Sequence, residues 1–182
     1  MTAGSNIVLV GFMGTGKSSV GRRLAAMLGM RFVDMDDAIE QRAGKPIPRI
    51  FAEDGEPHFR ALERALVADL SRQSGLIIAT GGGVVLNPDN IRDFSAGGLV
   101  VCLWANAGTI LARVGHETHR PLLAGDDKMA NVRGLMDARR KLYEAIPLRV
   151  DTDTLSVDQA AERVLRLYRA RTDATPHPSI EK

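Results

Sequence analysis

Short apolar segments alternate along the chain with longer amphipathic ones. Five of the short segments are rich in Val, Ile and Leu and lack polar alternation; they lie at residues 7–10, 32–34, 76–79, 99–103 and 148–150. Uninterrupted apolar character is typical of strands that are covered on both faces, as in a parallel sheet. The pattern therefore predicts a three-layer α/β/α protein with helices on both sides of a five-stranded parallel sheet.

The longer segments carry apolar residues at helical spacing, which indicates helices that pack one face against the sheet. The two clearest stripes are Val20, Leu24, Met27 and Leu28 after the first predicted strand, and Phe59, Leu62, Leu66 and Leu70 before the third. A capping box from Ser156 to Gln159 predicts the start of the last helix. Without a repeat or a linker, residues 1–171 form one predicted domain, and residues 172–182 a frayed C-terminal tail.

The segment GFMGTGKS at residues 11–18 adds the first chemical signal. It has the spacing Gly, four residues, Gly-Lys-Ser, and it lies between the first predicted strand and the first predicted helix. Glycines let backbone N–H groups surround a polyphosphate, while Lys17 would reach its β- and γ-phosphates and the Ser18 hydroxyl would bind Mg²⁺. The alternative is a glycine-rich turn with a chance Lys-Ser pair, and the strand–helix context argues against it.

Composition and charge exclude some classes of protein and of binding partner. The 182 residues are 45% apolar and 25% charged, and 24 basic against 22 acidic side chains give a formal charge of +2. These values exclude wholesale disorder and argue against a dedicated nucleic-acid binder. No apolar run approaches the roughly 18 residues of a membrane span, so we expect a cytoplasmic protein.

Two residue types add detail. The single cysteine, Cys102, is expected to be buried. Arginine outnumbers lysine by 19 to 5, and its planar guanidinium suits carboxylate and phosphate partners.

Two acidic residues lie at the end of the second predicted strand. The strand ends in Asp34-Met-Asp36, and its alternation puts both carboxylates on one face, at the carboxyl end where open α/β sheets bind ligands. One acid would then serve a metal and the other a substrate hydroxyl. The alternative is a helix N-cap plus a solvated acid, because a helix follows directly.

Two further segments hold candidate ligand groups. Arg60 and Glu63 are three residues apart on one helix face, which by itself is typical of an exposed ion pair. The run Thr80-Gly-Gly-Gly83 follows the third predicted strand. Its glycines permit close approach of the backbone to a ligand, and the alternative is a flexible turn.

Residues 114–125 differ in kind from the rest of the chain. They include two bracketing glycines and are mixed in polarity, which predicts a mobile lid. His116 and His119 have no evident third metal ligand nearby in the sequence, so we interpret them as residues of a solvated loop.

Taken in order, these segments resemble the shikimate kinase family, small P-loop kinases related to the nucleoside-monophosphate kinases. The resemblance spans about residues 6–169 and rests on GFMGTGKSS at 11–19, DMD at 34–36, IFAEDGEPHFRALE at 50–63, TGGG at 80–83, RPLL at 120–123 and RRKLY at 139–143. The P-loop is generic, whereas the ordered set of the others is specific. The resemblance implies a P-loop kinase fold and ATP-dependent phosphorylation of the shikimate 3-hydroxyl, a step toward chorismate and the aromatic amino acids.

The resemblance also implies roles for particular residues. Lys17, Asp36 and Arg120 would be catalytic, with Asp36 accepting a proton and Arg120 swinging in from the lid. The implied ATP-binding residues are Gly14, Thr15, Gly16, Lys17, Ser18, Ser19, Arg113 and Arg120. The implied shikimate-binding residues are Asp36, Arg60, Glu63, Gly81, Gly82, Gly83 and Arg139, with the two arginines on the carboxylate. Mg²⁺ is the implied cofactor, near Ser18 and Asp34. The family is mostly monomeric, so we expect a monomer.

Two other functions stay open at this point. A gluconate kinase would also use the P-loop and the lid, but the pair Arg60 and Arg139 and the glycines 81–83 argue against it. A non-catalytic nucleotide-binding module would share the fold, since fold alone does not establish turnover. Such a module should have lost an acceptor or lid residue, yet all four that matter most are present: Lys17, Asp34, Asp36 and Arg120.

Overall fold

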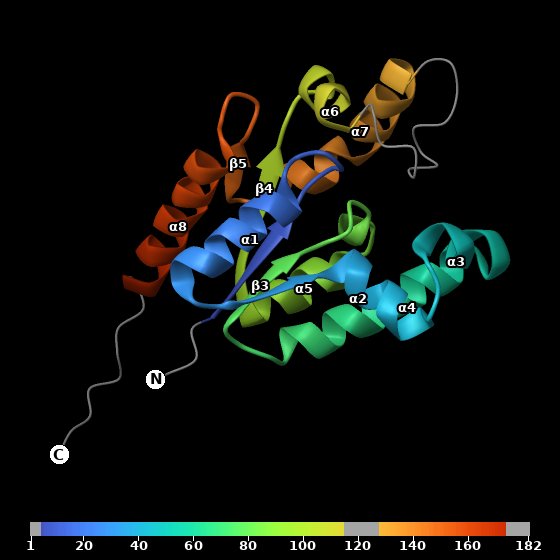
Figure 1. Cartoon of the computed structure of the whole chain (residues 1–182), viewed down its shortest axis with the longest axis horizontal. Helices are drawn as coiled ribbons and strands as arrows, with labels where there is room; N and C mark the ends of the chain where they lie inside the picture. The colour runs from blue at the N-terminus through green and yellow to red at the C-terminus, as the bar shows by residue number, and fades with distance from the viewer. Residues whose placement is uncertain (1–4, 115–127, 174–182) are drawn as a thin grey trace.

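The computed structural model describes residues 5–114 and 128–173, and this part of the chain forms three layers, with helices on both faces of a central sheet (Figure 1). The strands are β1 (Asn6–Val10), β2 (Arg31–Asp34), β3 (Leu76–Ala79), β4 (Gly98–Trp104) and β5 (Arg149–Asp151). All neighbouring strands are parallel, in the order β2-β3-β1-β4-β5. The predicted fold class is confirmed.

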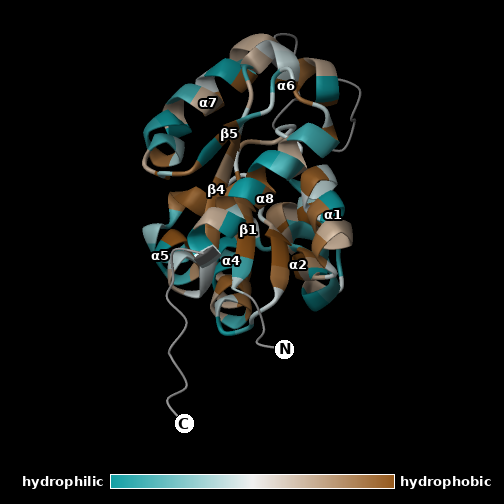
Figure 2. Ribbon diagram, turned by 90° about the vertical axis from the view of Figure 1, so that its left-hand side faces the viewer, coloured by the Kyte–Doolittle hydropathy of each residue, from teal (hydrophilic) through white to brown (hydrophobic). Residues whose placement is uncertain are grey.

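Both faces of the sheet are buried, because successive residues of a strand point to opposite sides. In β1, Ile7 and Leu9 pack on the side of α1 (Lys17–Leu28) and α8 (Val157–Asp173), whereas Val8 and Val10 pack on the other side. None of these four side chains is exposed. Figure 2 shows the hydrophobic colour gathered on β1 and β4. This double burial explains the unbroken apolar runs in the sequence.

The layer on the other face of the sheet, the side of Val8 and Val10, contains most of the elements around the candidate active site. Phe59 and Leu66 from the predicted stripe, Phe94, and Tyr143 belong to its core. Its elements are α2 (Met35–Ala43), α3 (Ile47–Glu53), α4 (Gly55–Ser71), the 3₁₀ turn η1 (Val84–Leu86), α5 (Pro88–Gly97), α6 (Ala107–Val114) and α7 (Lys128–Glu144).

Two predictions concern the ends of the last helix: the capping box at its start and the tail after it. The predicted capping box is confirmed: the Ser156 N–H donates to Gln159 Oε1 at 2.9 Å, and the Gln159 N–H donates to Ser156 Oγ at 3.2 Å. Helix α8 continues to Asp173, so Thr172 and Asp173, the first two residues of the predicted tail, are helical. The remaining tail residues, 174–182, lie outside the described part of the chain.

Cys102 in β4 is buried, as predicted. Burial raises the pKa of its thiol to about 11, so the thiol stays protonated and unreactive at neutral pH. Among the helices that the structure describes, none is long and apolar enough to span a membrane.

Candidate active site

The phosphate loop connects β1 to α1 at the carboxyl edge of the sheet. Gly11 has φ 144°, and a Cβ at this position would lie 2.2 Å from the carbonyl oxygen of Leu103, so only glycine fits. Gly16, at φ 94°, is the N-cap of α1, and neither a capping side chain nor an acidic residue occupies the first turn. The first N–H groups of α1 therefore face the loop with their positive dipole end available to an anion.

Lys17 lies at the centre of this loop. Its side chain is almost fully buried, and its Nζ donates to the carbonyl oxygens of Gly11 and Phe12, both at 2.9 Å. The loop thereby holds the ammonium group beside the N–H groups of α1. That a lysine at this position reaches phosphate oxygens stays a prediction from the sequence.

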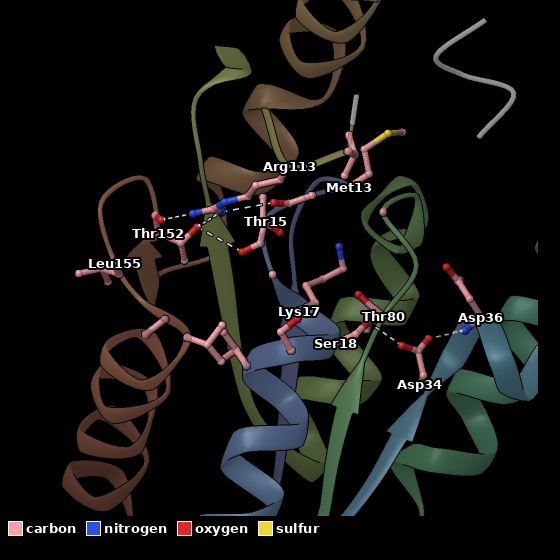
Figure 3. Close-up of a pocket in the computed structure, with 18 of the residues that line it drawn as sticks. Met13, Thr15, Lys17, Ser18, Asp34, Asp36, Thr80, Arg113, Thr152 and Leu155 are labelled. Atoms are coloured by element: carbon pink, nitrogen blue, oxygen red, sulfur yellow. Dashed lines mark hydrogen bonds between the residues drawn. The ribbon is translucent and has the colours of Figure 1, made fainter. Parts of the chain in front are cut away.

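Ser18 and Asp34 meet across the loop. The Ser18 hydroxyl donates to Asp34 Oδ2 at 2.6 Å, which joins the first turn of α1 to the end of β2 (Figure 3). Both groups are hard oxygen ligands of the kind that Mg²⁺ prefers. In the described residues, no cluster of three His, Cys, Asp or Glu side chains forms a metal site.

The prediction that Asp34 and Asp36 share one strand is wrong. Strand β2 ends at Asp34, and α2 begins at Met35, so Asp36 lies in the first turn of a helix. Asp34 is the N-cap of α2, because its Oδ1 accepts the Asp36 N–H at 3.1 Å. The capping alternative therefore holds for Asp34, while both carboxylates still line the same cavity.

This cavity has a volume of about 610 Å³ and runs from the phosphate loop in two directions. One end is lined by Asp34, Asp36, Thr80 and Gly82, and Figure 3 shows the first three beside Lys17 and Ser18. Its other end is lined by Arg113, Thr152 and residues 155–157, including the half-exposed Val157. The volume is in the range of small-ligand sites.

Arg113 at the second end is held by backbone groups. Its guanidinium donates to the carbonyl of Thr152 at 2.5 Å, to the Thr152 hydroxyl at 3.1 Å and to the carbonyl of Gly14 at 3.3 Å. The buried Thr152 hydroxyl also donates to the carbonyls of Trp104 and Thr15, at 3.0 and 3.2 Å. Thr152 thus links the phosphate loop, β4 and α6.

The first end of the cavity adjoins the glycines that follow β3. A Cβ on Gly81 would lie 2.9 Å from Asp36 Oδ1 and 3.3 Å from Glu63 Oε1, so bare backbone separates two carboxylates. Glu63 is 2% exposed. Burial raises the pKa of Glu63 above its ordinary value of 4.5, while the neighbouring Arg60 opposes that shift.

Both predicted carboxylate-binding arginines reach these glycines. Arg60 lies against Gly83, where a Cβ would come within 2.5 Å of its Nη1, and Arg139 Nη1 donates to the Gly82 carbonyl at 3.5 Å. Arg60 also pairs with Glu63 at 3.0 Å. The structure therefore brings together all the predicted acceptor-site residues: Asp36, Arg60, Glu63, Gly81, Gly82, Gly83 and Arg139.

Arg120 lies outside the described residues, as do the histidines at 116 and 119 and all of the predicted lid except Val114, the last residue of α6. Sequence reasoning gave no role to Tyr143 or Thr152, although both contact predicted site residues. The spacing of Tyr143 four residues after Arg139, one helical turn, is the signal that could have pointed to Tyr143.

A phosphate loop that opens onto a cavity lined by Asp34 and Asp36, with two arginines at the glycines beside it, is typical of a small-molecule P-loop kinase. The particular family follows from sequence comparison, in which the family model for shikimate kinase matches residues 13–169. The chain therefore belongs to the shikimate kinase family.

Individual relatives agree with this assignment. The chain is 43% identical over 164 residues to the shikimate kinase of Pelotomaculum thermopropionicum, covering 90% of this chain and 95% of that protein. It is 34% identical to a solved shikimate kinase from Acinetobacter baumannii in complex with shikimate, with a TM-score of 0.87 over 92% of this chain and 94% of the other. A gluconokinase from Sinorhizobium meliloti covers 96% of this chain and 98% of its own at a TM-score of 0.59, but its 20% identity supports only a common fold.

Proposed function

We propose that this chain transfers the γ-phosphoryl group of ATP to the 3-hydroxyl of shikimate, giving shikimate 3-phosphate and ADP. The observation that carries the proposal is the convergence of Arg60 and Arg139 on the glycines 82–83, beside the carboxylate of Asp36. A small acid with several hydroxyls needs cations at its carboxylate and hydrogen-bond acceptors at its hydroxyls. Membership of the shikimate kinase family supports the same substrate.

In this mechanism Asp36 removes the proton of the 3-hydroxyl as its oxygen attacks the γ-phosphorus. The bond between the γ-phosphorus and the bridging oxygen breaks, and ADP leaves with the electron pair. Lys17 would exchange its contacts to the carbonyls of Gly11 and Phe12 for phosphate oxygens. Positioning and charge stabilisation then supply most of the rate.

Ser18 and Asp34 would hold Mg²⁺, because a hydroxyl and a carboxylate 2.6 Å apart beside the phosphate loop supply oxygen ligands to a metal whose other partners are phosphate and water. Bound there, the metal would neutralise charge on the β- and γ-phosphates. Arg113, next to the 152–157 segment, would face the adenine, and Arg120 would stabilise the transferred group. A monomeric, cytoplasmic enzyme is part of the proposal, and size-exclusion chromatography with light scattering tests the monomer.

A coupled assay of ADP release tests the proposal. Shikimate should accelerate ADP release and gluconate should not; the reverse result would overturn it. Replacement of Asp36 by Asn should lower kcat by about 10²- to 10⁴-fold and leave ATP binding intact, as calorimetry can measure. Retained turnover in that variant would remove the assigned role of Asp36. Absence of turnover in the wild-type protein, with ATP still bound, would favour a non-catalytic module.

A further inference from the structure

The carbonyl groups of the three glycines at 81–83 are held in two different ways. The carbonyl of Gly81 accepts the Val84 N–H at 3.2 Å, and that of Gly83 accepts the Leu86 N–H at 2.9 Å, both within the local turn. The Gly82 carbonyl instead accepts the Tyr143 hydroxyl at 2.5 Å, from a residue 61 positions away on α7. The middle peptide is therefore oriented by a side chain from another element.

Three consecutive glycines need such an external hold, because their backbone has more conformational freedom than that of any other residue type. A trans peptide is planar, with its C=O and its following N–H pointing in opposite directions. A Gly82 carbonyl that points to α7 thus turns the Gly83 N–H away from α7. This N–H meets no acceptor among the described residues, and the Arg60 guanidinium lies against the same glycine.

We propose that Tyr143 is a positioning residue of the acceptor site: its hydroxyl fixes the Gly82 carbonyl and thereby aims the Gly83 N–H at the acceptor. This inference rests on the proposed function for the identity of the acceptor, shikimate. Tyr143 would act through Gly82 without touching the substrate itself.

The surroundings of Tyr143 fit this role. Its side chain is 1% exposed, and its ring meets the ring of Trp104 edge-on, with centroids 6.4 Å apart and an interplanar angle of 65°. The ring is therefore fixed by packing and leaves the hydroxyl little choice of partner. Burial raises the pKa of Tyr143 to about 12, so the hydroxyl remains a donor throughout the neutral range.

Arg139 shares the same carbonyl, one helical turn earlier on α7, at the longer distance of 3.5 Å. The shorter Tyr143 contact is the main one already without ligand, and it is the one that remains when Arg139 turns to the carboxylate of the acceptor. Its loss should therefore affect the KM for the acceptor and not the KM for ATP.

The chain offers a matched pair of substitutions, because it contains only two tyrosines. Tyr143→Phe removes the hydroxyl that holds Gly82. Tyr168→Phe makes the same chemical change on α8, where the hydroxyl donates to the Ser5 carbonyl at 3.2 Å, away from the cavity. Tyr143→Phe should raise the KM for shikimate about three- to tenfold and leave the KM for ATP unchanged, whereas Tyr168→Phe should change neither.

Hydrogen–deuterium exchange supplies a readout that needs no activity. Without ligands, amides of residues 80–86 should exchange faster in Tyr143→Phe than in the wild type or in Tyr168→Phe. Should Tyr143→Phe fold poorly, p-aminophenylalanine at position 143 restores a donor and should return both the exchange rate and the KM toward wild-type values. Unchanged exchange at 80–86, or an equal rise of both KM values, overturns the inference. A wild-type protein that ignores shikimate would instead refute the proposed function, and the exchange comparison would still decide the role of Tyr143.

Discussion

Arg60 Nη1 and Glu63 Oε2 lie 3.0 Å apart, in an ion pair whose acidic member is 2% exposed. The other side of the guanidinium pairs with Glu56 at 2.9 Å, and the Glu56 side chain is 57% exposed. The two acids bracket Arg60 and hold it against Gly83. The pKa of Glu63 is raised, which means that the loss of hydration of its carboxylate outweighs the favourable interaction with Arg60. Glu63 is therefore expected to serve the orientation of Arg60 at some expense of stability.

Replacement of Glu63 by Gln should separate these two effects. The free energy of unfolding at pH 7 should stay equal to that of the wild type or rise by up to about 1 kcal/mol, since a neutral amide is cheaper to bury. The KM for shikimate should rise about tenfold, because Arg60 loses its buried partner. Urea unfolding and steady-state kinetics measure the two quantities. Glu56→Gln, at the exposed partner, is the matched control and should change the KM less than threefold. A strongly destabilised Glu63→Gln variant with an unchanged KM would contradict this account.

The same carboxyl predicts a pH dependence of stability. A raised pKa means that the folded protein binds the Glu63 proton more tightly than the unfolded chain does, so the stabilising contribution is complete below 4.5 and is lost as the pH rises through the folded pKa. The difference in unfolding free energy, wild type minus Glu63→Gln, should therefore fall with increasing pH above 4.5. Urea titrations of both proteins across this range test the sign, and a difference that grows with pH would refute it.

The strands and the phosphate loop could be predicted because their signals are local. An apolar run between polar segments marks β1, and glycine spacing marks the loop after it. The placement of Asp36 could not be predicted in the same way. Whether β2 continues beyond Asp34 depends on which donor the Asp34 carboxylate meets, and it caps α2.

The roles of Tyr143 and Thr152 could not be predicted from the sequence for a different reason. The partner of the Tyr143 hydroxyl is 61 residues away, and the Thr15 carbonyl that Thr152 reaches is 137 residues away. A hydroxyl group has no spacing rule that predicts such a partner. In contrast, the predicted convergence of Arg60 and Arg139 came from a family resemblance, which carries long-range information that periodicity lacks.

Asp34 caps α2, and we propose that it also holds Mg²⁺; one substitution can separate these two roles. Asn retains the side-chain oxygen that caps α2 but removes the charge next to Ser18. Asp34→Asn should therefore leave the unfolding free energy within about 0.5 kcal/mol of the wild type. The Mg²⁺ concentration for half-maximal activity should rise at least about tenfold.

A matched control for this variant is Asp37→Asn in the same helix, where the carboxylate is 65% exposed. It should change neither quantity. Magnesium titrations of the ADP-release assay measure the requirement after the protein is treated with EDTA. An unchanged Mg²⁺ requirement in Asp34→Asn would show that Asp34 is a helix cap and nothing more.

Thr152 holds the nucleotide side of the cavity, so its substitution should affect the KM for ATP, whereas substitution of Tyr143 should affect the KM for shikimate. Thr152→Val keeps the shape of the side chain but removes the hydroxyl that accepts from Arg113 and donates to the carbonyls of Trp104 and Thr15. The Trp104 carbonyl keeps the Thr152 N–H as a donor at 2.8 Å, whereas the Thr15 carbonyl loses the hydroxyl, so the unfolding free energy should fall by about 1 kcal/mol. Because Arg113 and the phosphate loop both lose a contact, the KM for ATP should rise about three- to tenfold while that for shikimate stays constant.

Thr154→Val, at an exposed position of the same loop, is the matched control for Thr152→Val and should leave both KM values and the stability unchanged. If Thr152→Val instead raised the KM for shikimate as much as that for ATP, the two ends of the cavity would be coupled through the loop, and the independent roles assigned to Thr152 and Tyr143 would be wrong.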